Sequence, residues 1–227
     1  MKLTYYGHSS FILETSTSKI LFDPFISPNE LAKHIDINSL EVDFILQSHG
    51  HLDHFVDLQS IAKRTGAQVV SSWEITEWLK KKGIENVHPM NIGGSWKFPF
   101  GKVKMVFAAH SNSLPDGTYG GVAAGFIIEA DGMKVYYAGD TGLTHDMKLI
   151  GEYWTPDYAI LPIGDNFTMD VDDAIIASDF INCKEIIGMH FDTFGYIKIN
   201  HEEAIRKFEL RNKTLRLMEI GSTIELI

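Results

Sequence analysis

The sequence predicts an α/β (α+β) protein in which two mixed β-sheets pack face to face and carry helices on their outer faces. Two observations support this. Short runs rich in Val, Ile, Phe and Tyr, bounded by Gly, Pro, Asp or Asn, recur along the chain and are typical of strands. Segments with apolar residues at helical spacing separate these runs in both halves of the sequence. Adjacent strands that alternate with helices in this way favour layered sheets covered by helices.

The expected strands are Leu3–Tyr6, Ser10–Thr15, Lys19–Phe22, Phe44–Leu46, Gln68–Ser71, Lys102–Ala108, Ala124–Ala130, Lys134–Ala138, Tyr158–Leu161, Glu185–Gly188, Leu215–Leu217 and Thr223–Leu226. The expected helices are Phe55–Arg64, Ile75–Lys82, Asp146–Gly151, Val171–Asn182 and His201–Arg211. Asp131-Gly132, between two expected strands, indicates a two-residue hairpin. No linker or low-complexity segment divides the chain, so we expect one domain over residues 1–227.

Composition narrows the class of protein. The chain has 44% hydrophobic and 22% charged residues, which is typical of a globular protein. A formal net charge of −10 argues against a general nucleic-acid binder, which normally presents a basic surface. No apolar run is long enough for a membrane span, and the N-terminal segment lacks the features of a signal peptide. The single cysteine, Cys183, allows no intrachain disulfide, so we expect a cytoplasmic protein with this thiol in the core.

The densest chemical signal is the segment SHGHLDH, which directly follows the expected strand Phe44–Leu46. By this chain's own residue frequencies, the pattern H-x-H-x-D-H arises by chance in about one chain in a thousand. Histidine nitrogens and aspartate oxygens together suit zinc, manganese or iron. A tight turn at Gly50 can aim His49 and His51 in the same direction. Asp53 and His54 then lie at the start of the next helix. The segment therefore predicts a metal site.

Three isolated residues complete the candidate ligand set. His110, Asp140 and His190 each directly follow an apolar strand. One loop cannot surround two ions, whereas ligands at several strand ends can. Five histidines and two aspartates are what two ions require, and a carboxylate such as Asp140 can bridge them. The sequence therefore predicts a site for two divalent cations. Zinc is expected first, with manganese, iron or nickel as alternatives.

Several short motifs are spread along nearly the whole chain: YYGHSSFIL, LFDPF, SHGHLDH, AAHS, YGGVAAGF, AGDTG, LPIGDNFTM with the following DDA, and GMHFDTF. With these motifs the chain resembles the metallo-β-lactamase-fold hydrolases. Within them it is similar to the UlaG-like branch, and most of all to the UPF0173 metal-dependent hydrolases. The resemblance implies a four-layer αββα sandwich with its site at one edge of the sheets.

The resemblance also implies an order among the ligands. It assigns His49, His51 and His110 to one ion, Asp53, His54 and His190 to the other, and Asp140 to a bridging position. The chain departs from the family at Asp165-Asn166, where a Gly and a basic residue or His are usual, and at Gly195, where Pro is usual. Both segments border the site, so the substrate preference can differ from that of relatives.

The chemistry expected from this set is hydrolysis of an ester, lactone or phosphodiester of a small molecule. Two cations can share a bridging hydroxide at neutral pH and polarise the scissile group. Asp53 is the expected catalytic proton carrier. His8 is a candidate substrate contact or general acid, with a hydrogen-bonded structural histidine as the equal alternative. Asp165, Asn166 and Thr168 either contact substrate or cap the helix near Val171.

Three further residues have weaker assignments. Asp23 in FDPF is expected to fix the turn before Pro24. Thr193, three residues after His190, could orient a metal ligand. Cys183 is expected to pack in the core rather than to act as a nucleophile.

Alternative functions remain open at this point. A di-metal redox enzyme of the same fold is disfavoured, because such relatives carry Glu where this chain has His51. A metal-stabilised binding protein without catalysis would need the same ligands. A nuclease or phosphodiesterase of this fold fits the acidic balance less well than a small-molecule hydrolase does. We expect no nucleic-acid or membrane partner, and a homo-oligomer is compatible with the sequence.

Overall fold

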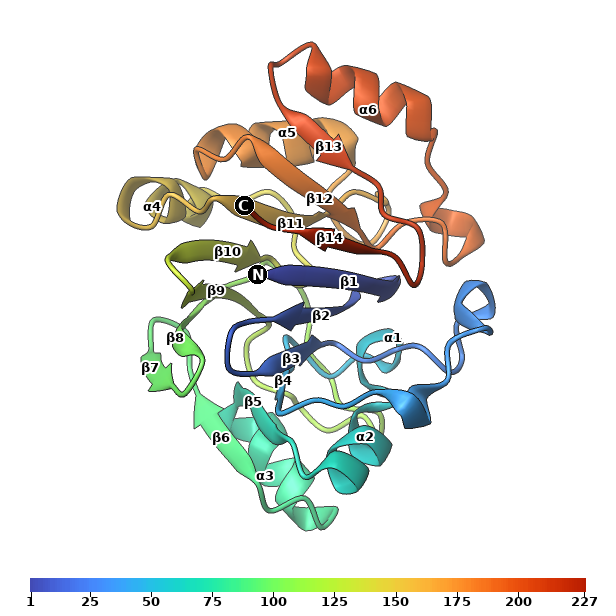
Figure 1. The fold of residues 1–227 in the computed structure, drawn as a ribbon, viewed down its shortest axis with the longest axis vertical. Coiled ribbons are helices and arrows are strands. Elements are labelled where there is room, and N and C mark those ends of the chain that lie inside the picture. The colour runs from blue at the N-terminus through green and yellow to red at the C-terminus, as the bar shows by residue number, and fades with distance from the viewer.

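Two seven-stranded mixed sheets form the centre of the molecule in the computed structural model, which describes residues 1–227 (Figure 1). The first sheet has the order β14-β1-β2-β3-β4-β5-β6 and the second β13-β12-β11-β10-β9-β8-β7. Both repeat one pattern: counted from β14 in the first sheet and from β7 in the second, three antiparallel pairings are followed by three parallel ones. The expected pair of mixed sheets is confirmed.

The first sheet comprises β1 (Lys2–Gly7), β2 (Ser10–Glu14), β3 (Lys19–Phe22), β4 (Phe44–Leu46), β5 (Gln68–Ser72), β6 (Val87–Met90) and β14 (Thr223–Glu225). The second comprises β7 (Ser95–Phe98), β8 (Gly101–Phe107), β9 (Ala124–Ala130), β10 (Met133–Tyr137), β11 (Tyr158–Pro162), β12 (Glu185–Met189) and β13 (Thr214–Arg216). The helices are α1 (Leu52–Phe55), α2 (Leu58–Thr65), α3 (Trp73–Lys81), α4 (Asp146–Tyr153), α5 (Val171–Phe180) and α6 (His201–Glu209). Three short 3-10 helices, η1 (Glu30–Ala32), η2 (Ile37–Ser39) and η3 (Gly195–Ile197), lie in loops.

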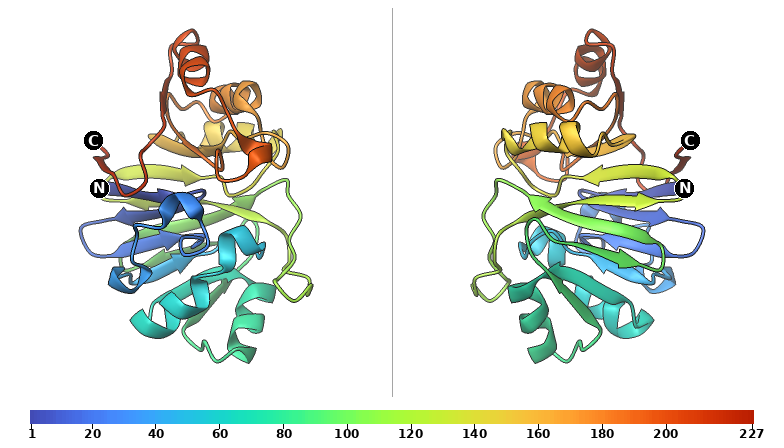
Figure 2. Two further views of the ribbon diagram at one scale, coloured as in Figure 1. Left: turned by 90° about the vertical axis from the view of Figure 1, so that its right-hand side faces the viewer. Right: turned by 90° about the vertical axis from the view of Figure 1, so that its left-hand side faces the viewer.

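The layers follow the αββα order that the resemblance implies. Figures 1 and 2 show α4, α5 and α6 on one side of the paired sheets and α2 and α3 on the other. The larger apolar core joins the two sheets, and Phe22 stacks on Tyr137 across them with ring centroids 4.6 Å apart. A smaller core fills the space between the outer face of the first sheet and α2 and α3. No helix is long and apolar enough to cross a membrane.

The expected strands and helices are present, but the structure adds β6, β7 and α1, and the expected helix Phe55–Arg64 begins at Leu58 as α2. β6 and β7 were not expected, because Pro89 interrupts the first and three of the four residues in the second are exposed. The hairpin at Asp131-Gly132 is confirmed, since β9 and β10 pair on either side and both turn residues have positive φ. Cys183 is buried, as expected.

Strand direction positions the site. The parallel strands of the first sheet, β3 to β6, end at one edge of the sandwich, and those of the second, β10 to β13, do the same. The segments that follow β4, β8, β10 and β12 hold all seven expected metal ligands. Contacts among these ligands join both sheets at this edge.

Candidate metal centre

The loop between β4 and α1 is held by hydrogen bonds that leave little freedom to its histidines. The side-chain amide of Gln47 donates to the carbonyls of His49 (2.6 Å) and His54 (3.2 Å). The Gly50 N–H donates to Asn112 Oδ1 (2.8 Å), and a Cβ atom at Gly50 would lie 2.9 Å from the Ser113 carbonyl oxygen. Glycine is therefore required at this close approach. As expected, α1 contains Asp53 and His54.

The first ligand group is a trio of histidine nitrogens. His51 Nδ1 lies 3.1 Å from His49 Nε2 and 3.2 Å from His110 Nε2. Zinc–nitrogen bonds of about 2.0–2.1 Å in a tetrahedral site place nitrogens roughly 3.3 Å apart. Both distances are close to this spacing, and the three ligand atoms lie within 4.8 Å of one another. His51 and His110 also line a cavity that is open to solvent.

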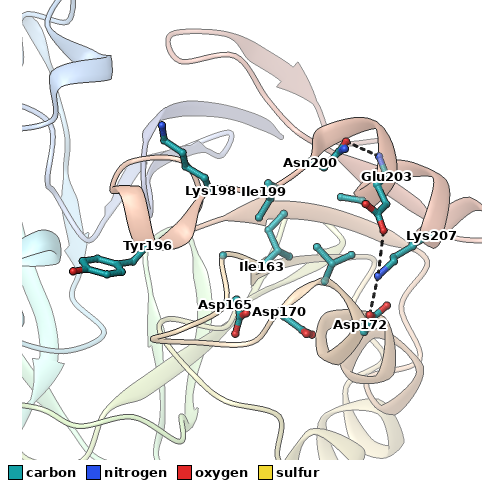
Figure 3. Close-up of a pocket in the computed structure, with 13 residues that line it drawn as sticks. Ile163, Asp165, Asp170, Asp172, Tyr196, Lys198, Ile199, Asn200, Glu203 and Lys207 are labelled. Carbon is teal, nitrogen blue, oxygen red and sulfur yellow. Dashed lines mark hydrogen bonds and ion pairs between the residues drawn. The ribbon is translucent and has the colours of Figure 1, made fainter.

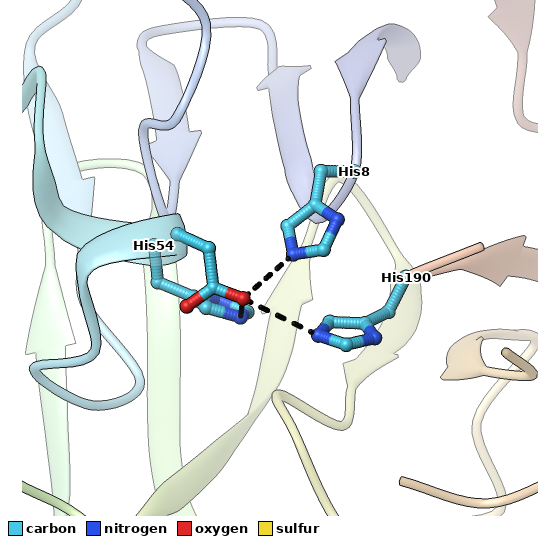
Figure 4. Close-up of side chains that lie close together, drawn as sticks. His8, His54 and His190 are labelled. Carbon is cyan, nitrogen blue, oxygen red and sulfur yellow. Dashed lines mark hydrogen bonds and ion pairs between the residues drawn. The ribbon is translucent and has the colours of Figure 1, made fainter. Parts of the chain in front are cut away.

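The second ligand group combines a carboxylate with two histidines. Asp53 Oδ2 lies 3.7 Å from His190 Nε2 and 3.9 Å from His54 Nε2. The His8 ring lies beside this group, and the ligand atoms of all four residues are within 4.8 Å of one another. Figure 4 shows His8, His54 and His190 directed toward a common point. His190, from the second sheet, therefore completes a group that begins on α1.

Asp140 lies between the two groups. Its Oδ2 atom is 3.0 Å from His190 Nε2 and 3.2 Å from His54 Nε2 in the second group. The same atom is 3.6 Å from His110 Nε2 and 4.0 Å from His49 Nε2 in the first. A single oxygen atom of Asp140 therefore faces nitrogens of both groups.

Unpaired atoms in this buried cluster test whether a cation fits. His54 Nε2, Asp140 Oδ1 and both ring nitrogens of His190 are buried and make no hydrogen bond of acceptable geometry. Buried polar atoms normally have partners, because leaving them unpaired is costly. A divalent cation bound by the second group would satisfy His54 Nε2 and one of the two ring nitrogens of His190. The donor set therefore fits metal ions.

The electrostatics of the two groups differ. Burial lowers the pKa of each imidazole in the trio, so these nitrogens are unprotonated at neutral pH. In the second group burial acts in the same direction, but the Asp140 carboxylate outweighs it. This carboxylate raises the pKa of His190 to about 9 and holds that of His54 well above its usual value. Burial opposes ionisation of Asp140, yet the adjacent imidazoles hold its pKa well below the usual range.

Asp23 contacts the site in a way that the sequence did not reveal. Its Oδ2 atom lies 2.9 Å from His54 Nδ1 and accepts from the Tyr137 hydroxyl at 2.8 Å, while Oδ1 accepts from the Ser48 N–H at 2.8 Å. The Ser48 hydroxyl lies 2.9 Å from His49 Nδ1. Asp23 thus orients His54 directly, and His49 through Ser48, from the buried side of the site. The sequence predicts only a role in the turn before Pro24. The available signal was its place directly after β3, at the edge where the ligands gather.

His8 has both ring nitrogens occupied. Nδ1 lies 2.9 Å from Thr193 Oγ1, and Nε2 lies 3.2 Å from Asp53 Oδ2. The ring is buried and does not line the cavity, and burial lowers its pKa to about 3. A neutral imidazole with Nδ1 facing the Thr193 hydroxyl can donate its Nε2–H to Asp53. This arrangement favours the hydrogen-bonded structural role among the alternatives for His8, and it gives Thr193 its expected orienting role through His8.

A cavity of about 760 Å³ opens onto both ligand groups. Its lining includes Phe167 but not Asp165, Asn166 or Thr168, the expected substrate contacts. Asp165 and Asn166 have φ values of 65° and 55°, a left-handed conformation that Asp and Asn tolerate better than most residues. Their turn presents the Phe167 side chain. Neither they nor Thr168 cap α5, because its first turn is capped by Asp170, whose Oδ1 accepts from the Asp173 N–H.

Asp165 instead lines a separate cavity of about 250 Å³ between the start of α5 and α6 (Figure 3). The charged residues there, including Asp170, Asp172 and Lys207, pair partly with one another, and no histidine is present. Tyr196 contributes to both cavities and forms part of the wall between them.

Comparison with known proteins agrees with this architecture. Residues 18–191 match the family model described as "Beta-lactamase superfamily domain". Proteins named "UPF0173 metal-dependent hydrolase" from Flavobacterium johnsoniae and Christiangramia forsetii are 59% and 56% identical, and each alignment covers 100% of both chains. The solved structure of Igni18, described as a novel metallo hydrolase from Ignicoccus hospitalis, is 37% identical with a TM-score of 0.89, over 100% of this chain and 99% of that one. The chain therefore belongs to the UPF0173 family of metal-dependent hydrolases, within the beta-lactamase superfamily.

Proposed function

We propose that this protein hydrolyses an ester, lactone or phosphodiester bond of a small molecule with two divalent metal ions. His49, His51 and His110 would hold one ion, and Asp53, His54 and His190 the other. The observation that carries the proposal is the position of Asp140 Oδ2, which lies within 4.0 Å of histidine nitrogens from both groups. An oxygen in this position would contact ions held by both groups, and a site for one ion would not need it.

The ions, when bound, would supply a water of lowered pKa and Lewis acidity toward the carbonyl or phosphoryl oxygen. The residues of the chain determine how the substrate reaches the site and how the metal ligands are oriented. The trio lies at the cavity wall through His51 and His110, so a substrate that enters the cavity reaches the ligand groups directly. Asp23 and Ser48 fix the orientation of the His54 and His49 rings from the buried side.

Asp53 is the proposed proton carrier. Its carboxylate lines the cavity and is 29% exposed, whereas Asp140 is buried with 2% exposure. Burial raises the pKa of Asp53, but the adjacent His190 and His8 imidazoles outweigh it and leave the pKa well below its usual range. In this state Asp53 is ionised and accepts a proton from the attacking water. It can then deliver that proton to the leaving group within the same cavity.

Metal content and turnover together test the proposal. The chain purified with chelator is reconstituted with zinc, manganese, iron or nickel, and bound metal is counted by plasma mass spectrometry. Hydrolysis is measured with methyl acetate, δ-valerolactone and dimethyl phosphate by titration of released acid. We expect two ions per chain and turnover only in reconstituted protein. One ion per chain would refute the dinuclear site, and undiminished turnover after chelation would refute metal dependence. Two tightly bound ions without turnover of any substrate would favour a metal-stabilised binding protein instead.

A further inference from the structure

The walls of the cavity beyond the metal ligands carry no positive charge. Besides His51, Asp53, His110, Asp140 and His190, the cavity is lined by Ser111, Phe167, Thr193, Phe194, Gly195 and Tyr196. No Lys or Arg is among them. The nearby Lys198 lines the separate cavity by α5 and α6, and Figure 3 shows its side chain diverging from that of Tyr196. An anionic group on the substrate, away from the metal ions, would therefore meet no cation of the protein.

Aromatic side chains dominate these walls, and they are exposed. Phe194, Phe167 and Tyr196 are 37%, 51% and 79% exposed, respectively. Phe167 and Tyr196 form an edge-to-face pair with centroids 6.4 Å apart. Exposed aromatic residues gathered at one concave site are typical of a ligand-binding surface rather than of scattered surface residues.

The aromatic walls are held from behind by the same elements that position the metal ligands. The Phe194 ring packs on His8 and Phe25, with centroids 5.4 and 6.1 Å away. Phe167 projects from the turn in which the Asp165 N–H donates to the Met169 carbonyl at 3.0 Å. Two distant segments, one after β11 and one after β12, thus supply rings to one cavity.

The cavity walls offer a polar substrate few hydrogen-bonding groups. Three hydroxyls line the cavity. That of Tyr196 belongs to one of the three rings, and that of Thr193 lies 2.9 Å from His8 Nδ1. The Ser111 hydroxyl lies 3.4 Å from His51 Nε2 and so is next to the metal ligands rather than beside the rings. A Cβ atom at Gly195 would meet nothing within 4 Å, so open space remains beside the rings.

We propose that the substrate is an uncharged ester or lactone whose group remote from the scissile bond is aromatic or bulky and apolar. This group would lie among Phe167, Phe194 and Tyr196. The inference rests on the proposed hydrolase function and narrows it, since it disfavours substrates with a second anionic group.

A matched set of methyl esters tests the preference. Methyl phenylacetate, methyl acetate and monomethyl malonate carry a phenyl group, a hydrogen and a carboxylate at the same position. Benzyl acetate, an isomer of the first, places the ring on the alcohol side. After division by the uncatalysed rate, we expect kcat/KM for at least one ring-bearing ester to exceed that for methyl acetate by about tenfold or more. Monomethyl malonate should be the poorest substrate. Equal or greater kcat/KM for methyl acetate or monomethyl malonate would overturn the inference.

Substitution of two exposed aromatic residues tests where the preference for ring-bearing esters arises. Phe167→Ala and Tyr196→Ala should each reduce the ratio of kcat/KM for the preferred ring-bearing ester to that for methyl acetate by about tenfold. Tyr153→Ala is the matched control, because this tyrosine is 66% exposed on α4 and does not line the cavity. An equal change of the ratio in the control would contradict the location, and thermal melting checks that all three variants are folded.

Binding of amides separates this inference from the hydrolase proposal. Phenylacetamide and acetamide are uncharged and resist hydrolysis, and their binding to chelated and metal-loaded protein can be compared by saturation-transfer NMR. We expect phenylacetamide to bind more tightly in both forms and Phe167→Ala to remove the difference. Equal binding of the two amides would overturn the aromatic site whatever the turnover. Tighter binding of phenylacetamide without turnover of any ester would support the aromatic site and count against hydrolysis.

Discussion

The two ligand groups contain different residue types and carry different charges. The trio of His49, His51 and His110 contains only neutral nitrogens, with pKa values lowered by burial. The second group contains the Asp53 carboxylate and two imidazoles that the Asp140 carboxylate holds protonated. The trio is therefore ready to accept a cation at neutral pH, whereas the second group must first lose protons. The two ions should therefore bind with unequal affinity, and the trio should fill first.

Substitution of one histidine of the trio should have the largest effect on metal content and on kcat/KM. His51→Ala deletes a nitrogen that lies 3.1–3.2 Å from the other two and also opens the cavity wall. We expect loss of one bound ion and a fall in kcat/KM of more than about 100-fold, the upper end for losing an outer partner of a ligand. Metal analysis and ester hydrolysis measure both. His145→Ala, at an exposed histidine on the start of α4, is the control and should retain both ions. Retention of both ions in His51→Ala would contradict the assignment of the trio.

Asp23→Asn should weaken binding of the second ion more than binding of the first. The Asp23 carboxylate lies 2.9 Å from His54 Nδ1, and loss of its charge should weaken His54 as a ligand. We expect the affinity of the second ion to fall about 10- to 100-fold. The first ion should lose less, because Asp23 reaches His49 only through Ser48. Calorimetric titration of the two ions measures the split.

The control for Asp23→Asn is Asp57→Asn. Asp57 is another buried aspartate, whose carboxylate accepts from the backbone N–H groups of Ile26 and Ser27 and has no metal ligand as a partner. Asp57→Asn should lower stability without changing the ratio of the two affinities. An equal loss for both ions in Asp23→Asn would mean that Asp23 supports the fold alone.

The pH dependence of metal binding should also differ between the groups. The pKa of His190 is raised to about 9 from 6.5, and that of His54 is raised as well, so both are protonated at neutral pH without metal. Binding of the second ion must release these protons. Its apparent affinity should therefore rise with pH between about 6.5 and 9, by roughly tenfold per unit for each proton released. The first ion should show little dependence in this range, because the pKa values of the trio are lowered.

Calorimetry in buffers of different ionisation enthalpy counts the released protons for each ion in turn. Proton release confined to the first ion would reverse the proposed order of filling.

The sequence predicted the ligand residues better than the surroundings that hold them. Strand-end position together with the SHGHLDH cluster selects His110, Asp140 and His190. The strands before them, β8, β10 and β12, run in the same direction and so end at one edge of the second sheet. Asp23 follows the same rule, but the sequence favoured a role in the turn before Pro24 instead. Its contact with His54 depends on how two loops fold against each other, which residue types do not encode.

The residues that line the cavity beyond the metal ligands were also harder to predict, because their orientation depends on how the loops fold. Asp165 and Asn166 are polar and border the site, so they were expected to contact substrate, yet their backbone adopts φ values that these residues tolerate. The consequence is that the neighbouring Phe167 lines the cavity instead. Whether a side chain faces a cavity in a tight turn depends on local φ and ψ values. The β6 strand was missed because Pro89 normally argues against a strand.

The smallest effect should come from His8, which touches only the second group. Its Nε2–H can donate to Asp53 Oδ2 at 3.2 Å, while Thr193 occupies Nδ1. His8→Ala should weaken the second ion by about tenfold, at the low end for such partners, because the bond is long and the ring neutral. His8→Gln, which retains an N–H donor, should recover most of this affinity. A purely space-filling role would leave the ratio of the two affinities unchanged in both variants. Thermal melting reports the packing loss separately, so a drop in stability with unequal ion affinities would identify His8 as a residue that positions Asp53.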